Sequence, residues 1–164
     1  MTDKRTIDSF INKYHLGGNI ERIKWVSDNE SLSAKFINDS QNLVGQIKSK
    51  NFQFPVGEFG IYSTSTLSKL LGILENEVMF DINKEGGTPS KFIIGDTSMD
   101  ISFNLADPQV IPNVPAINKM EGNVEIELDE EFTTKFIKAK DAVGEEVFYI
   151  STRDGFTSKE VMFT

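Results

Sequence analysis

The sequence of 164 residues contains no cysteine and only one histidine. Without cysteine the chain has no disulfide framework, no thiolate nucleophile and no thiolate metal site. The single histidine, His15, falls near the end of a predicted helix. There an imidazolium more often stabilises the helix dipole than catalyses a reaction or binds a metal. These shortages remove the residues on which most nucleophilic and metal-dependent enzymes depend.

Catalytic and nucleotide-binding motifs are also missing. The sequence has no P-loop, no G-x-S-x-G and no G-x-G-x-x-G, and Gly86-Gly87 is typical of a hairpin turn. The dense carboxylates between residues 125 and 131 fit a solvated strand edge and a helix start better than an acid–base pair. We therefore expect a protein that is not an enzyme and that has no cofactor and no metal.

Long hydrophobic runs are absent as well. No stretch approaches the roughly 18 apolar residues of a membrane-spanning helix, and the first residues lack the apolar core of a signal peptide. We therefore expect a cytoplasmic protein without a membrane partner. The net charge of -8 argues against adhesion to nucleic acid over the whole surface, although it allows a local basic lining.

Hydrophobic periodicity predicts an α+β fold with a β-rich core that is dominated by the 13 phenylalanines. Apolar residues at helical spacing predict helices over residues 3–15, 64–74 and 129–143. Alternation between turn signals predicts strands over residues 20–26, 32–37, 43–48, 58–63, 78–84, 91–95, 99–104, 123–128, 146–152 and 156–163. Antiparallel pairing of consecutive strands is the simplest arrangement.

A proline-rich stretch from residue 105 to residue 118 divides these elements. Prolines at positions 108, 112 and 115 exclude a helix interior or a central strand, so the stretch should run extended across a surface. Its apolar residues indicate that it is packed on a domain rather than freely solvated. The predicted organisation is a first domain over residues 1–105, a connector over residues 106–118 and a second domain over residues 119–164.

The two predicted domains begin alike. Residues 3–36 and 129–161 share the order helix, glycine stop, strand, turn and strand, although identities are few and chance is the alternative. In the second copy we expect a core face made by Phe132, Phe136, Ile137 and Val143. If the repeat is genuine, the second copy is cut short, and we expect its C-terminal part to be missing.

The positions of the basic residues are informative in so acidic a chain. Lys135 and Lys138 share a stripe of the third predicted helix away from its apolar face. Lys69 lies on an exposed side of the second helix, and Arg5 and Lys13 lie on the polar face of the first. One interpretation is a set of solubilising charges. The other is helices that present cations to phosphates, without reading bases.

Two segments resemble the sliding clamps, the polymerase processivity factors, of T-even-like bacteriophages. The run F-G-I-Y-S-T-S-T-L-S-K-L-L-G-I-L, residues 59–74, is similar to the strand-to-helix run of that family. The A-D-P at residues 106–108, followed by further prolines, a strand, a helix and an apolar strand, matches the same family in order. The resemblance covers nearly the whole chain.

This resemblance implies a DNA-clamp fold of two similar domains, each with antiparallel sheet on one face and helices on the other. Clamp subunits join head to tail through sheet edges into a ring, a homotrimer in this phage family, which encircles duplex DNA and tethers the polymerase after a clamp loader has placed it. By this resemblance the candidate phosphate contacts are Arg5, Lys13, Lys69, Lys135 and Lys138. Partner peptides would dock beside the connector, near Val110, Ile111 and Val114, for which simple packing is the alternative role.

Other interpretations remain open from the sequence. An acidic, β-rich phage structural or assembly protein without a DNA role has the same composition, and an enzyme whose site lies in a missing part is a remote third. A shortened second domain would also lack a subunit edge, so this chain would be a monomer or would pair through an unpaired strand edge. In a phage-encoded protein the expected location is the host cytoplasm.

Overall fold

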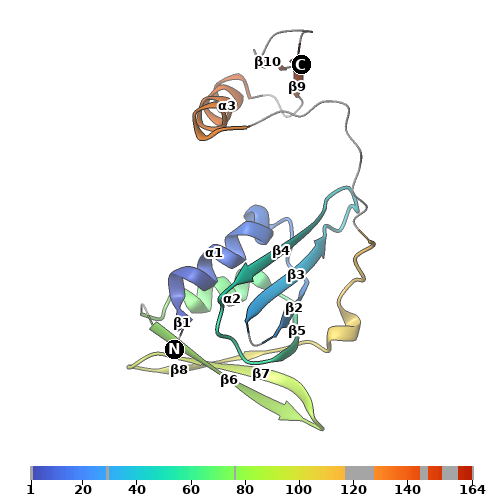
Figure 1. Cartoon of the computed structure of the whole chain (residues 1–164). Coiled ribbons are helices and arrows are strands. Elements are labelled where there is room, and N and C mark those ends of the chain that lie inside the picture. The colour runs from blue at the N-terminus through green and yellow to red at the C-terminus, as the bar shows by residue number, and fades with distance from the viewer. Residues whose placement is uncertain are drawn as a thin grey trace. The chain divides into compact units, whose positions relative to one another are not determined.

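The computed structural model of the chain describes residues 2–28, 30–75, 77–116, 128–144, 148–152 and 159–163 (Figure 1). The chain divides into two compact units, residues 1–118 and 119–164. The expected strand at residues 123–128 lies almost wholly outside the described residues, as does the expected turn at residues 153–155. Within the described part the fold is α+β with antiparallel sheets.

The first unit contains two four-stranded antiparallel sheets and two α-helices. Its first half comprises β1 (Thr2–Asp3), α1 (Lys4–His15), the 3₁₀ turn η1 (Leu16–Gly18), β2 (Ile23–Ser27), β3 (Ser31–Ile37) and β4 (Val44–Lys50). Its second half comprises β5 (Gly57–Ile61), α2 (Thr64–Leu71), β6 (Glu77–Glu85), β7 (Thr88–Gly95) and β8 (Asp100–Asn104). The predicted helices and the seven strands predicted between residues 20 and 104 are confirmed, with shifted ends; β1 was not predicted.

The two halves repeat one motif, a strand followed by a helix and three strands, and they exchange their first strands. One sheet has the order β4-β3-β2-β5 and the other the order β1-β6-β7-β8. Strand β5 therefore completes the sheet of the first half, while β1 completes that of the second. Helices α1 and α2 contact each other (Figure 1). Neither half can complete its sheet alone, because each depends on a strand from the other.

Both helices begin at a capping side chain and bury one apolar stripe. The carboxylate of Asp3 accepts a hydrogen bond from the backbone N–H of Arg5 at 2.9 Å, and the hydroxyl of Ser63 accepts one from Thr66 at 3.3 Å. The buried residues of the two stripes are Ile7, Phe10, Ile11, Tyr14, Thr64, Leu67 and Leu71. Helix α1 ends at His15, as predicted, and Leu16 caps it in the left-handed conformation with φ of 49°.

The core of the first unit is centred on Trp25, which is fully buried. The rings of Phe10, Phe54 and Phe92 lie 5.5, 5.8 and 6.2 Å from the indole, centroid to centroid. The indole N–H donates to the hydroxyl of Tyr14 at 3.3 Å. Burial raises the pKa of this phenol well above its ordinary value, so the hydroxyl stays neutral. Helix α1 is therefore attached to both sheets through one aromatic cluster.

A polar junction joins the end of α1 to the start of α2. The carboxylate of Glu21 accepts hydrogen bonds from the backbone N–H of Ser65 at 2.9 Å and from its hydroxyl. The Nε2 atom of His15 lies 3.1 Å from the same carboxylate and 3.2 Å from the Ser65 hydroxyl. Strand β2 begins at Ile23 rather than at residue 20, because Glu21 is hydrogen-bonded to the first turn of α2 instead of pairing in the sheet. His15 lies at the end of α1, as expected.

The connector is fastened to the first unit at its start. The backbone N–H of Ala106 donates to the carbonyl of Gly60 at 2.9 Å, forming an isolated bridge to β5. Pro108 then opens a 3₁₀ turn, η2 (Pro108–Val110), which Asp107 caps. A wholly extended path was therefore wrong at this point, because proline is tolerated in the first turn of a helix. Ile111 is buried, with 6% of its surface exposed.

The second unit contains α3 (Glu130–Val143) and the antiparallel pair β9 (Phe148–Thr152) and β10 (Lys159–Phe163). Asp129 caps the helix by accepting from the N–H of Phe132 at 2.7 Å. Phe132 and Phe136 are partly covered, but Ile137 and Val143 are 52% and 54% exposed. The expected core face is therefore wrong for the last two, because the described strand pair is too narrow to cover the whole stripe.

The Glu21 junction should make stability depend on acid pH. Its burial raises the pKa, but hydrogen bonds from Ser65 and the contact with His15 outweigh that effect and hold the pKa below the ordinary value of 4.5. The ionised carboxylate therefore stabilises the fold above pH 4.5, and this contribution is lost as pH falls through the folded pKa. We expect Glu21→Gln to cost about 0.5–1 kcal/mol at pH 7, a value reduced for partial exposure, and much less at pH 3.

Urea unfolding of both proteins at the two pH values measures this difference. Glu77→Gln is the matched control, since that exposed side chain forms no hydrogen bond or ion pair in the part of the chain that the structure describes, and it should change stability little at either pH. An equal loss for Glu21→Gln at pH 7 and pH 3 would contradict the assigned role of the charge.

The attachment of the connector depends on a glycine. A Cβ atom at Gly60 would lie 2.4 Å from the backbone oxygen of Ala106. This distance is too short, so β5 or the start of the connector would have to move. We expect Gly60→Ala to destabilise the first unit by about 1–3 kcal/mol and to increase cleavage by proteases between residues 107 and 116. Gly72→Ala, whose Cβ would meet nothing closer than 3.2 Å, should leave the cleavage rate unchanged. Equal cleavage of the two variants in limited proteolysis would count against this fastening.

Candidate functional site

Two of the expected phosphate-contacting residues line one groove on the first unit. Arg5 and Lys13 lie two turns apart on the exposed face of α1, with Ser9 between them. The groove between this face and β4 has a volume of about 320 Å³. Its lining residues are Arg5, Thr6, Ser9, Phe10, Lys13, Ile47, Lys48 and Ser49. We call it the helix groove; its polar groups are three cations and three hydroxyls.

Lys48 is the residue that sequence reasoning missed. It was placed in a strand but not among the candidate cations, because nothing in the sequence shows that β4 is the outermost strand of its sheet. None of Arg5, Lys13 and Lys48 forms an ion pair within the described ranges. All three are exposed, so their charges are available to an anion.

The other three candidates belong to α2 and α3. Lys69 is exposed in the last turn of α2 and does not line the helix groove. Lys135 and Lys138 belong to the second unit, on the exposed side of α3. The ammonium of Lys135 lies 2.5 Å from a carboxylate oxygen of Glu131, and this contact raises its pKa. Lys138 is exposed and forms no ion pair among the described residues.

A second groove lies between the connector and the open face of β2, β3 and β4, with a volume of about 630 Å³. We call it the connector groove. It is lined by Lys24, Val26, Ser33, Ala34, Lys35, Gln46, Ile47, Lys48, Ile111, Pro112, Asn113 and Val114. Of the expected partner-binding residues, Ile111 is a buried wall, Val114 is a half-buried lining residue and Val110 is 62% exposed outside it.

The connector groove combines an apolar floor with basic sides. Val26 and Val114 offer apolar surface, while Lys35 and Lys48 are exposed cations. The ammonium of Lys24 lies 3.3 Å from a carboxylate oxygen of Glu58, so part of its charge is already compensated. A peptide with apolar side chains and neighbouring carboxylates is the ligand that such a lining favours.

The strongly shifted carboxylates have structural roles. Hydrogen bonds from the backbone of Glu75 and from Ser98 hold the pKa of Asp96 far below its usual range, within the turn between β7 and β8. Asp28 plays the same part before β3, with its pKa lowered by the N–H of Glu30 and by Ser31. Within the described ranges no three metal-binding side chains gather, and no helix is long and apolar enough to span a membrane.

Comparisons with known proteins give no family for this chain: no family model matches it, and no curated protein matches it.

Proposed function

We propose that this protein is a sliding clamp subunit, which encircles duplex DNA as part of a ring and tethers a replicative polymerase. The observation that carries the proposal is the helix groove, whose lining includes Arg5, Lys13 and Lys48, none of them in an ion pair within the described residues, in a chain of net charge -8. Concentrated basic charge in an acidic protein indicates a local polyanionic ligand. The function is DNA binding and tethering rather than catalysis.

The architecture supports this proposal. A clamp subunit, as the sequence resemblance implies, carries antiparallel sheets on one face and helices on the other. The first unit has two antiparallel sheets, with α1 and α2 in contact with each other. The second unit opens in the same way as the first, with an aspartate-capped helix followed by an antiparallel strand pair. Both features are consistent with two related domains of one clamp fold.

The chemistry of the helix groove suits phosphates. Arginine and lysine bind phosphate oxygens, and the hydroxyls of Thr6, Ser9 and Ser49 can donate to the same oxygens. A contact made only to phosphates would be independent of sequence and sensitive to salt, as a protein that slides along DNA requires.

Ring closure and partner binding complete the proposed mechanism. Strands β4 and β8 end their sheets, so within the described residues each has an unpaired edge through which subunits could add, as a trimeric ring requires. The connector groove would receive apolar, acidic peptides of the polymerase and the clamp loader. A ring needs no tight DNA contact, because its topology retains the DNA.

One observation favours the second candidate, an acidic phage structural or assembly protein. The ion pair between Lys135 and Glu131 partly neutralises one of the expected DNA contacts, as in an ordinary solvated helix face. The two functions differ in whether the protein, with an active loader and polymerase, lengthens products on primed circular DNA. Failure there, with both partners shown to be active, excludes the clamp.

Charge neutralisation in the helix groove should change the salt dependence of DNA binding. We expect Lys13→Gln and Lys48→Gln each to reduce the slope of log K against log salt concentration by about 1, with a weaker affinity at low salt. Fluorescence anisotropy with a short labelled duplex measures both quantities. Lys84→Gln, on the exposed β6 side chain outside the groove, makes the same change in net charge and should leave the slope unaltered. Identical slopes for all three variants would rule out a localised contact.

The connector groove should be needed for tethering but not for DNA contact. We expect Val114→Asp to shorten polymerase products on primed circular DNA about tenfold, because it places a carboxylate where an apolar, acidic peptide would dock. Val110→Asp is the matched control, since that side chain lies outside the groove. The salt slope of DNA binding should be the same in both variants. Equal product lengths would place the partner site elsewhere.

A further inference from the structure

On one side of strand β6, the neighbouring strand pairs with only two of its residues. Strand β7 pairs with it from Met79 to Glu85, but on the other side β1 supplies only Thr2–Asp3, opposite Glu77–Val78. From Phe80 to Asn83, β6 has no strand partner on that side within the residues that the structure describes. A partly open strand edge is a template to which another extended chain can add.

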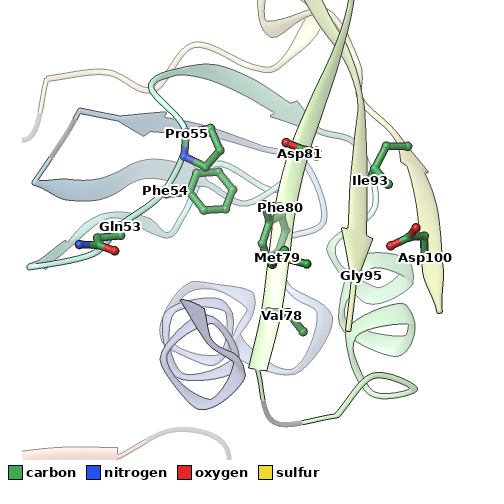
Figure 2. A pocket seen from close by; sticks show the side chains of 10 residues that line it. All are labelled: Gln53, Phe54, Pro55, Val78, Met79, Phe80, Asp81, Ile93, Gly95 and Asp100. Atoms are coloured by element: carbon green, nitrogen blue, oxygen red, sulfur yellow. The ribbon is translucent and has the colours of Figure 1, made fainter. Parts of the chain in front are cut away.

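Beside this open edge lies a cavity of about 630 Å³, which is lined by the segment Gln53–Pro55, by Val78–Asp81 of β6, and by Ile93, Gly95 and Asp100 of β7 and β8 (Figure 2). The ring centroids of Phe54 and Phe80 lie 4.9 Å apart, so the segment packs against β6. Phe54 is 6% exposed, so its position is set by the core and not by a ligand. The cavity is therefore preformed and has an aromatic floor, and its volume is in the range of ligand sites.

The charge of this cavity is opposite to that of the two grooves. Among the described residues that line it, Asp81 and Asp100 are the charged ones, and both side chains are exposed. Neither carboxylate is in an ion pair or a hydrogen bond within the described ranges. Met79, 53% exposed, adds apolar surface beside them. DNA and acidic peptides would be repelled here, whereas a cationic ligand with apolar groups would be attracted.

We propose that this cavity binds an extended peptide of a partner protein, which adds as a strand to β6 and alternates basic with apolar side chains. Side chains of a strand alternate between its two faces, so Asp81 and Met79 lie on one face of β6 and Phe80 on the other. In an added strand, residues on the first face would lie beside Asp81 and those on the second beside Phe80 and Pro55. The first set should be basic and the second apolar. This binding site does not depend on the clamp proposal.

The test uses the full chain, labelled with ¹⁵N, and synthetic peptides. The probe is acetyl-Ser-Lys-Leu-Lys-Val-Lys-Ser-amide, which has the proposed alternation. One comparison peptide replaces each lysine with glutamate, and another has the same composition but groups its lysines together. We expect the probe to shift the amide signals of Phe80, Asp81 and Ile82, and to bind at least about fivefold more tightly than either comparison peptide.

Variants separate charge from backbone pairing. Asp81→Asn combined with Asp100→Asn should weaken probe binding about fivefold, while Glu85→Gln, on the same strand but outside the cavity, should not. Methylation of the probe's backbone nitrogens at alternate residues should abolish binding if those nitrogens donate to β6. The proposal is overturned if the double variant binds as tightly as the parent protein. It is also overturned if the glutamate peptide binds equally well, or if the shifted amides belong to the connector groove.

Discussion

The exchange of first strands between two halves is the constraint on which the first unit depends. Because β5 completes the sheet of the first half and β1 that of the second, neither four-stranded sheet can form from consecutive residues alone. The exchange holds both halves around one aromatic core, in which Trp25 contacts phenylalanines from helix, loop and strand. It also determines where the edges fall. The last strand of each half, β4 or β8, is left outermost, and β1 is too short to cover β6.

The two grooves and the third cavity described above lie beside these edges. The helix groove and the connector groove share Ile47 and Lys48, since both border β4 from opposite sides. The third cavity borders the part of β6 that β1 leaves open. Lysines line the first two and aspartates the third, so one small domain offers surfaces of opposite charge. Ligands of opposite charge could therefore bind the same unit without competing.

The sequence was sufficient to predict the individual helices and strands, but it did not predict which elements lie next to one another. Periodicity predicted α1, α2 and α3, because their apolar stripes and capping residues are local. It did not predict the strand exchange, since pairing such as that of Thr2 with Val78, far apart in the sequence, leaves no local pattern. Lys48 was missed for the same reason, because it lines a groove only when β4 is the outermost strand of its sheet. Ile137 and Val143 show the converse, an apolar stripe whose burial depends on how much sheet lies opposite it.

The net charge of -8 is compatible with the proposed DNA contact because electrostatic range in salt is short. At physiological ionic strength the Debye length is about 8 Å, so a phosphate in the helix groove would interact mainly with Arg5, Lys13 and Lys48 and weakly with distant carboxylates. Three solvated contacts would give modest affinity that falls steeply with salt. Under the proposed function such a contact would not by itself keep a polymerase on DNA. A second means of retention would be needed, and a closed ring would supply one that does not slow sliding, because it adds no contact that must break at each step.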